Sequence, residues 1–299
     1  MSPLRIGTRR SRLAIAQAEL VKNLLSGIGA EAEIVPMITS GDEGQAAEGS
    51  AQGLKGLWTD SILDALEAGK LDLAVHSAKD LPAEDDEGFL IGAVPERGDP
   101  FDVLITRGAT LPPKAVIGTS SLRRRAQLLA SFPGLTVADL RGNVDTRLRK
   151  LADGEVDAAV LAAAGLARLG VEPAFARTLT VDEMVPAPGQ GALAVQCRDD
   201  DELTLAALTA IDHAPSHAAL DAERSLMWRL GGGCALPLGA YAGWQGTVLH
   251  LVALVATPGG DRVLRAEAVG DAPETVAGDV ARDLIDLGAE EILAEVREG

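Results

Sequence analysis

Short apolar runs alternate with helical repeats along the first third of the chain. Apolar side chains recur at helical spacing between Ser11, which can cap a helix, and Gly27, which can end it. The pattern predicts strands over 5–8, 31–38 and 71–75, and helices over 11–27 and 59–68. Strands that alternate with helices in this way are typical of βαβ units with parallel sheets.

The same alternation resumes after a turn at Gly98 and Pro100, where we place a domain boundary. Strands are predicted over 101–106, 114–117, 135–140 and 156–162, with helices that begin near residues 122 and 144. The apolar run 192–196 is predicted to return to an earlier sheet. From about residue 213 the pattern changes to a helix over 217–230, a glycine-rich turn, two strands joined by 258–261, and two closing helices.

These elements predict an α/β protein with three domains. Domain 1 is discontinuous and consists of 1–97 and 190–212, domain 2 is 98–189, and domain 3 is a smaller α+β domain over 213–299. Residues 39–56 form a long polar, glycine-rich loop, and loops of that length are often lids or binding loops.

The composition is that of an ordinary globular protein, with 47% hydrophobic and 24% charged residues. It excludes a disordered, collagen-like or coiled-coil architecture, and the 3% aromatic share requires a core of Ala, Leu, Val and Ile. No apolar run reaches the roughly 18 residues that span a bilayer, and the amino terminus lacks the apolar stretch of a secretory signal. We therefore expect a cytoplasmic protein whose two cysteines, Cys197 and Cys234, are thiols.

The charge of the chain is strongly negative but unevenly distributed. The net charge is -17, which disfavours nucleic acid as a partner. Residues 118–150 nevertheless contain seven basic and two acidic residues. Several of these basic residues follow predicted strands, where helix amino termini favour anions. The window therefore predicts a cleft for a small, multiply anionic ligand, although a solvated helix face would show the same spacing.

Other candidate positions have two interpretations each. Thr119 and Ser121 can bind an anion or merely cap a helix, and no phosphate-loop or dinucleotide motif supports nucleotide binding. Asp80, at the end of an apolar strand, can stabilise a cation and move protons, or can be a turn residue. His213 and His217 are four residues apart, but Pro215 and the lack of a third ligand disfavour a metal site.

Cys234 follows three glycines, which let the backbone bend and give a ligand close access. No neighbouring His or Cys marks this thiol as a protease or redox nucleophile. From chemistry alone, Cys234 can therefore be a thiol that a ligand can reach or a structural thiol.

Seven segments together resemble the porphobilinogen deaminase (hydroxymethylbilane synthase) family, in the order of that family and over nearly the full chain. The segments are Ile6-Gly-Thr-Arg-Arg-Ser-Arg-Leu-Ala, Val75-His-Ser-Ala-Lys-Asp-Leu-Pro, Ile117-Gly-Thr-Ser-Ser-Leu-Arg-Arg-Arg-Ala-Gln, Leu140-Arg-Gly-Asn-Val-Asp-Thr-Arg-Leu, Leu161-Ala-Ala-Ala-Gly-Leu-Ala-Arg-Leu-Gly, Pro186-Ala-Pro-Gly-Gln-Gly-Ala-Leu, and Glu223-Arg-Ser through Gly232-Gly-Gly-Cys-Ala-Leu-Pro.

The resemblance implies two lobes like those of periplasmic binding proteins and a third domain that carries a dipyrromethane cofactor as a thioether on Cys234. It implies a transferase of tetrapyrrole (porphyrin and heme) biosynthesis, which condenses four porphobilinogen molecules head to tail into hydroxymethylbilane and releases ammonia. It further implies a monomer without nucleic-acid or membrane partners and without a metal.

The resemblance also implies the roles of individual residues. Asp80 is the implied catalytic residue. The implied cofactor-binding residues are Ser77, Lys79, Thr119, Ser121, Arg123, Arg124, Arg141, Gly142, Arg147, Gly165 and Cys234. The implied substrate-binding residues are Arg9, Ser11, Lys55, Arg141, Arg147 and Arg168. Because every pyrrole ring of the substrate brings two carboxylates, a cleft rich in arginine would answer that charge.

The sequence departs from the family pattern in the long polar loop, where the usual Gly-Gly-Lys-Gly-Leu-Phe is Gly53-Leu-Lys-Gly-Leu-Trp58. The packing of a lid there is therefore in doubt. The main alternative function is a non-catalytic binding module with two lobes, which needs neither a modified Cys234 nor a carboxylate at Asp80. A phosphate-transferring enzyme is disfavoured because the phosphate-loop motif is absent.

Overall fold

The computed structural model describes residues 2–37, 60–132, 134–232 and 236–298. The chain divides into two compact units, the first comprising Met1–Arg97 with Ala192–His217 and the second comprising Gly98–Gly191 with Ala218–Gly299. The chain therefore passes into the second unit at Gly98 and returns to the first at Ala192. A separate third domain from residue 213 stays a prediction.

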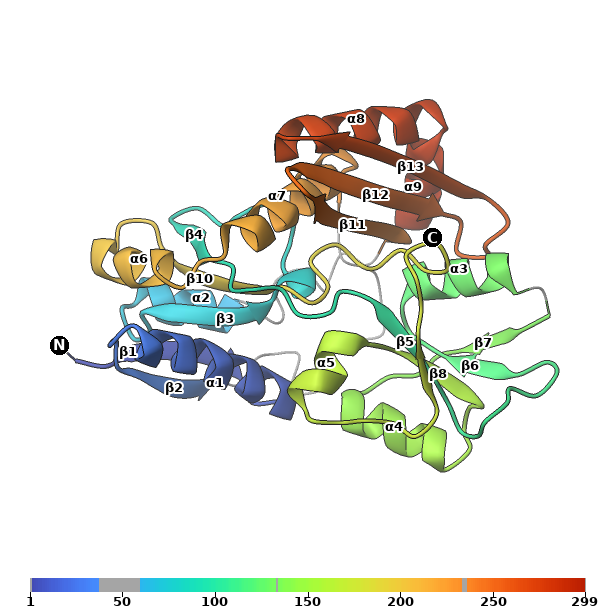
Figure 1. Ribbon diagram of the computed structural model, residues 1–299, viewed down its shortest axis with the longest axis horizontal. Coiled ribbons are helices and arrows are strands. Elements are labelled where there is room, and N and C mark those ends of the chain that lie inside the picture. The colour runs from blue at the N-terminus through green and yellow to red at the C-terminus, as the bar shows by residue number, and fades with distance from the viewer. Residues whose placement is uncertain (1, 38–59, 133, 233–235, 299) are drawn as a thin grey trace. The chain divides into compact units, whose positions relative to one another are not determined.

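The sheet of the first unit has the strand order β2-β1-β3-β10-β4 (Figure 1). Its strands are β1 (Leu4–Arg9), β2 (Ala32–Met37), β3 (Leu73–Ser77), β4 (Phe89–Ala93) and β10 (Leu193–Arg198). Strands β1, β2 and β3 are parallel, whereas β10 pairs antiparallel with both β3 and β4. The predicted return of the chain to an earlier sheet is thus confirmed, whereas the sequence pattern did not predict β4.

Helices cover both faces of this first sheet because its buried strands are apolar on each side. Leu73 and Val75 pack with α1 (Arg12–Gly27) and α6 (Glu202–Thr209) in one cluster. Ala74, which points to the opposite face, packs in another cluster with residues of α2 (Asp60–Glu67). The first helix begins as predicted, since the Ser11 side chain accepts a hydrogen bond from the Ala14 N–H at 3.2 Å.

The sheet of the second unit repeats the same topology, with the order β7-β6-β8-β5-β9. Its strands are β5 (Asp102–Thr106), β6 (Val116–Gly118), β7 (Thr136–Ala138), β8 (Ala158–Ala162) and β9 (Ala176–Thr178). Strands β6, β7 and β8 are parallel, and β5 is antiparallel to β8 and β9. In each sheet, the antiparallel fourth strand is the one that the chain forms directly after it crosses from the other unit.

The helices of this second sheet also lie on both faces. They are α3 (Leu122–Ser131), α4 (Val144–Ala152) and α5 (Ala163–Arg168). Along β8, Ala158 and Val160 pack in a cluster with Leu128 of α3, whereas Leu161 packs with Leu151 of α4. The alternation places α3 on one face of the sheet and α4 on the other.

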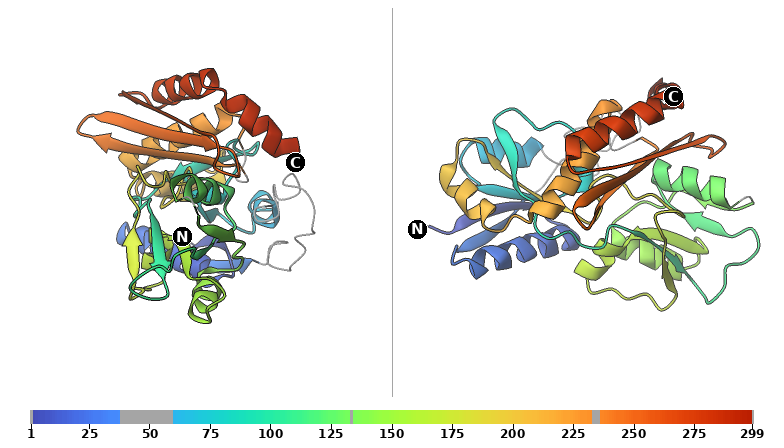
Figure 2. Two further views of the ribbon diagram at one scale, coloured as in Figure 1. Left: turned by 90° about the vertical axis from the view of Figure 1, so that its right-hand side faces the viewer. Right: turned by 45° about the horizontal axis from the view of Figure 1, so that its top comes forward.

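A third sheet, also in the second unit, comprises β11 (Leu238–Gln245), β12 (Val248–Ala256) and β13 (Val263–Gly270). The prediction of two strands here was wrong, because the turn at Gly246 adds a hairpin ahead of the predicted turn at 258–261. The helices α8 (Pro273–Asp286) and α9 (Ala289–Glu298) lie on one side of this sheet, as Figure 2 shows. Val252 and Leu254 of β12 pack with Ala126 of α3, and Leu128 of the same helix packs on β8, so α3 contacts both the second and the third sheet.

Helix α7 (Ala214–Arg229) starts three residues earlier than predicted, with Pro215 in its first turn, where a missing N–H costs nothing. Its buried carboxylate, Glu223, accepts hydrogen bonds from the N–H groups of Gly189 at 2.6 Å and Ala242 at 2.7 Å. Glu223 therefore ties the segment that leaves the second unit to the third sheet.

Among the described residues, every helix is too short or too polar to cross a lipid bilayer.

The chain enters the second unit through an incoming segment that begins at Gly98 and leaves it through an outgoing segment that ends at Gly191. These two segments are in contact. The Gly98 N–H donates to the Gly191 carbonyl at 3.1 Å, and Gly191 has a φ of +87°. A Cβ atom at Gly191 would lie 2.5 Å from the Gly98 carbonyl oxygen, so only glycine fits there.

We expect Gly191→Ala to lower the free energy of unfolding by at least about 3 kcal/mol, because backbone strain and a steric clash add. Gly170→Ala is the matched control: Gly170 also has a positive φ, but a Cβ atom there would meet nothing within 4 Å, so only about 1 kcal/mol should be lost. Urea unfolding measures both variants. Equal losses would show that the close approach at Gly191 is unimportant.

Candidate functional site

Four of the predicted site residues meet in the first unit. Arg9 ends β1, Ser11 caps α1, Ser77 ends β3, and Asp80 lies in the 3-10 turn η2 (Ala78–Asp80). Because β1 and β3 are parallel neighbours, their carboxyl ends lie at the same edge of the sheet. All four residues line one cavity of about 70 Å³.

The backbone around Asp80 is held by two hydrogen bonds. The Ala78 N–H donates to the Ala192 carbonyl at 3.1 Å, and the Leu81 N–H donates to the Ala78 carbonyl at 3.2 Å. Asp80 itself is exposed, and its neighbour Lys79 is half-buried. The turn therefore presents a carboxylate to solvent from a fixed backbone at the end of a buried strand.

Two polar residues of this cavity were not predicted from the sequence. Gln17 of α1 is buried and donates from Nε2 to the Ser77 hydroxyl at 2.7 Å. His76 is buried at the same strand end, and burial lowers the pKa of its imidazole to about 4. Neither residue stands out in the sequence, since a glutamine within an apolar helix gives no sign of its partner.

In the second unit, the predicted residues follow three adjacent parallel strands. Thr119 and Ser121 lie between β6 and α3, and the Ser121 hydroxyl caps α3 by accepting from the Arg124 N–H at 3.4 Å. Arg141 and Gly142 follow β7 ahead of α4, and Gly165 lies in α5 directly after β8. The order β7-β6-β8 brings these three groups to one edge of the sheet, where helix amino termini favour anions.

Two arginines near α4 lie at that edge, with Arg141 exposed and Arg147 half-buried. The Arg141 side chain is 81% exposed and donates from Nε to Asp139 at 2.7 Å. Arg147, one turn into α4, donates from Nε to the Gly142 carbonyl at 2.7 Å. A hydrogen bond from Ser120, with help from Arg141, lowers the pKa of the Asp139 carboxyl. These guanidinium groups are oriented but remain open to solvent.

Arg168, at the carboxyl end of α5, donates from Nη2 to the Gly191 carbonyl at 2.6 Å. Burial lowers the pKa of its guanidinium to about 10, so the group stays cationic at neutral pH.

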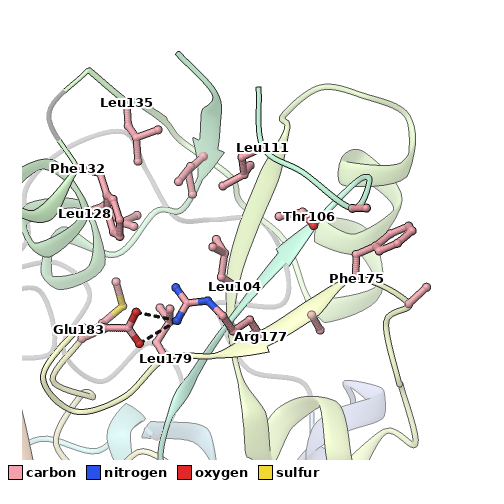
Figure 3. A pocket seen from close by; sticks show the side chains of 15 residues that line it. Leu104, Thr106, Leu111, Leu128, Phe132, Leu135, Phe175, Arg177, Leu179 and Glu183 are labelled. Carbon is pink, nitrogen blue, oxygen red and sulfur yellow. Dashed lines mark hydrogen bonds and ion pairs between the residues drawn. The ribbon is translucent and has the colours of Figure 1, made fainter. Parts of the chain in front are cut away.

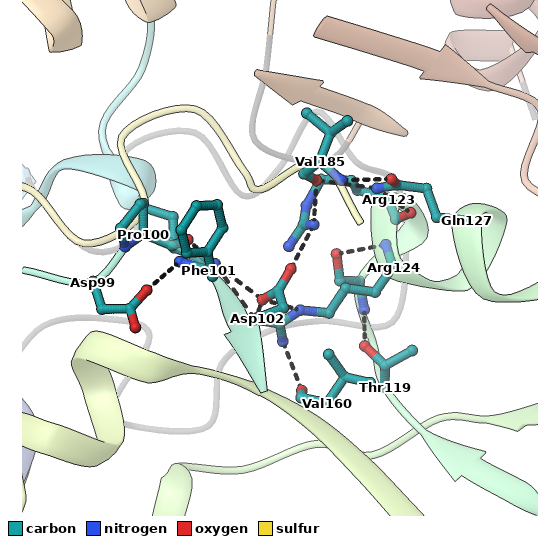
Figure 4. A network of polar contacts seen from close by, with 12 residues as sticks. Asp99, Pro100, Phe101, Asp102, Thr119, Arg123, Arg124, Gln127, Val160 and Val185 are labelled. Atoms are coloured by element: carbon teal, nitrogen blue, oxygen red, sulfur yellow. Dashed lines mark hydrogen bonds and ion pairs between the residues drawn. The ribbon is translucent and has the colours of Figure 1, made fainter. Parts of the chain in front are cut away.

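Arg123 and Arg124 differ from the other arginines because they are buried, at 3% and 5% exposure. Figure 4 shows both guanidinium groups around the carboxylate of Asp102, which is fully buried. Arg123 Nη1 donates to Asp102 Oδ2 at 2.7 Å, and Arg124 Nη2 donates to Oδ1 at 2.7 Å. Although burial opposes ionisation, the two cations hold the pKa of Asp102 below its usual range.

The two remaining predicted residues, Lys55 and Cys234, lie outside the described residues. The other cysteine, Cys197, is buried in β10 as a free thiol, and burial raises its pKa to about 11. His213 and His217 do not share a partner, because their Nδ1 atoms lie 2.8 Å from Ser216 Oγ and Asp212 Oδ1 respectively. Within the ranges that the structure describes, no cluster of three or more His, Cys, Asp or Glu side chains could hold a metal ion.

A larger cavity lies elsewhere in the second unit. It measures about 530 Å³ and is lined mainly by apolar side chains, among them Leu104, Leu128 and Leu179 (Figure 3). The charged groups on its wall, Arg177 and Glu183, pair with each other at 2.6 Å. None of the predicted site residues lines it, so cavity size alone does not mark the candidate site.

The hydrogen-bond donors of the predicted site residues fit a ligand that carries several carboxylates. They combine guanidinium groups, hydroxyls and helix amino termini at the strand ends of each unit. In addition, Arg123 Nε is buried without a hydrogen-bond partner, although buried donors normally have one. Fold and site thus define a two-lobed α/β protein, with a third small sheet, whose strand ends are suited to a polyanionic small molecule.

Comparison with known proteins identifies the family. Residues 4–206 match the family described as porphobilinogen deaminase, dipyromethane cofactor binding domain, and residues 218–286 match porphobilinogen deaminase, C-terminal domain. The chain belongs to the porphobilinogen deaminase family. The expectations of an α/β enzyme of the transferase class with a dipyrromethane cofactor are thereby confirmed.

Similar full-length relatives support this membership. The porphobilinogen deaminase of Brevibacillus brevis is 45% identical, over 99% of this chain and 98% of its own length. That of Acidithiobacillus ferrooxidans is 47% identical, over 98% of each chain. Among solved structures, the periplasmic VFT2 domain of Bordetella pertussis BvgS is 13% identical with a TM-score of 0.42, over 70% of this chain and 86% of its own.

The buried His76 predicts a pH dependence of stability. The unfolded chain takes up a proton on this imidazole near pH 6.5, whereas the folded protein does so only near pH 4. The free energy of unfolding should therefore fall as the pH drops through this window, by up to about 3 kcal/mol. Urea unfolding at several pH values should show a shallower decline in His76→Asn than in the wild type. Parallel declines would mean that His76 is not the group responsible.

Proposed function

We propose that this protein condenses four porphobilinogen molecules into hydroxymethylbilane, with Asp80 as its catalytic residue. The observation that carries the proposal is the cavity of the first unit, where Asp80 shares a wall with Arg9, Ser11 and Ser77. One acidic group is thus surrounded by cationic and hydroxyl donors. The carboxylate has the chemistry to act on the reacting pyrrole, while the donors suit the carboxylates of the same molecule.

Each addition breaks one C–N bond and forms one C–C bond. When the aminomethyl group of porphobilinogen leaves as ammonia, positive charge develops on the methylene carbon and the pyrrole. Asp80 accepts a hydrogen bond from the pyrrole N–H and stabilises that charge. The acceptor ring's α-carbon then attacks the methylene carbon and loses its proton, which the Asp80 carboxylate can accept and pass on to solvent. Its exposed position suits both tasks.

The other predicted residues bind carboxylates in this proposal. Arg9 and Ser11 bind substrate in the first unit together with Lys55, while Ser77 and Lys79 contact the cofactor. In the second unit, the proposed cofactor and substrate contacts come from the turns and helices that follow β6, β7 and β8. They are Thr119, Ser121, Arg123, Arg124, Arg141, Gly142, Arg147, Gly165 and Arg168.

Cys234 is the proposed anchor of the dipyrromethane cofactor. When bound, this group supplies the primer whose free α-carbon receives the first substrate ring. Helix α7 ends just ahead of Cys234, where the Gly232 N–H donates to the Met227 carbonyl at 2.8 Å and Gly231 has a φ of +68°. Arg297 of α9 donates to the carbonyls of Leu230 and Gly231 at 2.8 and 2.7 Å, which fixes this helix end.

The alternative of a non-catalytic binding module, which would need neither a carboxylate at Asp80 nor a covalent group, is not supported, because the chain belongs to a family of enzymes. The cytoplasmic location, the monomeric state, and the lack of nucleic-acid and membrane partners expected from the sequence stay predictions.

Removal of the proposed anchor should remove the cofactor. We expect Cys234→Ala to lack the mass increment of two linked pyrrole units and to be inactive, because a thioether needs the sulfur. Cys197→Ala is the matched control and should keep both the increment and turnover, since its thiol is buried in a core cluster. Intact-protein mass spectrometry with peptide mapping reads out both variants. An active Cys234→Ala protein would exclude the proposed anchor.

Loss of the Asp80 carboxylate should abolish catalysis without unfolding the protein. Asp80→Asn keeps the side-chain shape but removes the charge, so turnover should fall by about 10²–10⁴-fold. Asp64→Asn, an exposed position on α2 of the same unit, should leave turnover unchanged. Ammonia release from porphobilinogen and thermal unfolding should be measured together. Near-normal turnover in Asp80→Asn would remove Asp80 from the proposed mechanism.

A further inference from the structure

The buried carboxylate of Asp102 is not among the residues that the sequence or the family resemblance singled out. It begins β5, directly after the chain enters the second unit, and is fully buried. Its two oxygens accept four hydrogen bonds, from Arg123, from two nitrogens of Arg124 and from Gln190, at 2.7 to 3.1 Å. Oδ1 accepts three of these hydrogen bonds and Oδ2 accepts one, so both oxygens of Asp102 are held by donors.

The same donors reach further, to backbone carbonyls on three other segments (Figure 4). Arg123 Nη1 also donates to the Val185 carbonyl at 2.7 Å, and Arg124 Nη1 donates to the Val160 carbonyl of β8 at 2.9 Å. Gln190 Nε2 donates to the Pro100 carbonyl at 2.7 Å. The carboxylate of Asp102 and its donors thus connect the incoming segment, the first turn of α3, the strand β8 and the outgoing segment.

The network holds two guanidinium groups against one carboxylate. Its net charge is therefore positive, and Arg123 Nε remains buried without an acceptor. Buried cations with flexible side chains need a fixed acceptor, because otherwise they turn toward solvent or unfold their surroundings. Without Asp102, neither guanidinium group would retain a charged partner among the interactions that the structure describes.

We propose that Asp102 is the positioning residue of the cofactor site: its two oxygens fix the guanidinium groups of Arg123 and Arg124 in the orientation that the second unit offers to ligand carboxylates. The inference rests on the proposed function for the role of the two arginines. Asp102 touches neither substrate nor cofactor in this proposal and acts only through the arginine pair.

The test compares Asp102→Asn with Asp157→Asn in the full-length protein. Asp157 is a matched control in the same unit, since it also accepts from an arginine, Arg107, at 3.4 Å and from a backbone N–H, that of Val116, at 2.9 Å. Proton–nitrogen NMR of arginine-labelled protein reports the Nε–H signals of buried guanidinium groups. Mass spectrometry reports the fraction of protein that carries the two-pyrrole increment.

We expect Asp102→Asn to lose the Nε–H signals of Arg123 and Arg124 and to lower the loaded fraction at least about tenfold. The KM for porphobilinogen of the remaining loaded protein should rise more than its kcat falls, because the arginines hold carboxylates and do not take part in proton transfer. Asp157→Asn should retain the signals, the loaded fraction and the KM. A folded Asp102→Asn protein with wild-type signals and loading would overturn the proposal.

Asp102→Asn leaves two buried cations without a counter-charge, so a second variant covers the case in which it does not fold. Gln190→Ala removes one donor to Asp102 and creates no unpaired charge. It should reduce the loaded fraction in the same direction but less, with broadened Nε–H signals, and unchanged values would refute the proposal. If the wild type itself lacks the increment and turnover, the proposed function fails, whereas the NMR comparison still decides whether Asp102 orients the arginines.

Discussion

The burial of two arginines against a single aspartate is the constraint on which the second unit depends. Guanidinium groups in a protein interior are tolerated only with fixed acceptors, and Asp102 supplies these at the point where the chain enters the unit. The carbonyls of Val160 and Val185 complete the coordination. The strand ends of the second sheet, the first turn of α3 and the outgoing segment are therefore held by one electrostatic arrangement.

A second constraint is topological and is common to both units. Each sheet contains three parallel strands and one antiparallel strand supplied by the crossing chain. The helices that follow parallel strands all begin at the same edge of the sheet, so each unit has one edge that is suited to anions. The same repeat places a glycine in the second strand of each order, β1 and β6, where a Cβ at Gly7 or Gly118 would lie within 2.6 Å of a leucine side chain. An acidic chain thereby has edges that are suited to carboxylates.

Much of the candidate site could be predicted from the chain alone. The basic window over 118–150 and the strand that ends at Asp80 placed the chemistry on strand ends, and the structure puts Arg9, Ser11, Ser77 and Asp80 around one cavity. The partners of these residues could not be predicted. Asp102 lies 21 positions from Arg123, and Gln17 lies 60 positions from Ser77, so no local pattern connects them.

The sequence by itself determined the alternation of strands and helices, the helix cap at Ser11 and the excess of basic residues at strand ends, because each depends on neighbours within a few positions. The tertiary structure alone decided which arginines are exposed, as Arg141 is, and which are buried, as Arg123 is. It also decided the short edge strands β4 and β9, whose pairing partners lie far away in the sequence. Burial and strand pairing are set by long-range packing. The identity of a residue and of its neighbours in the sequence therefore does not predict which distant carboxylate or strand it will contact.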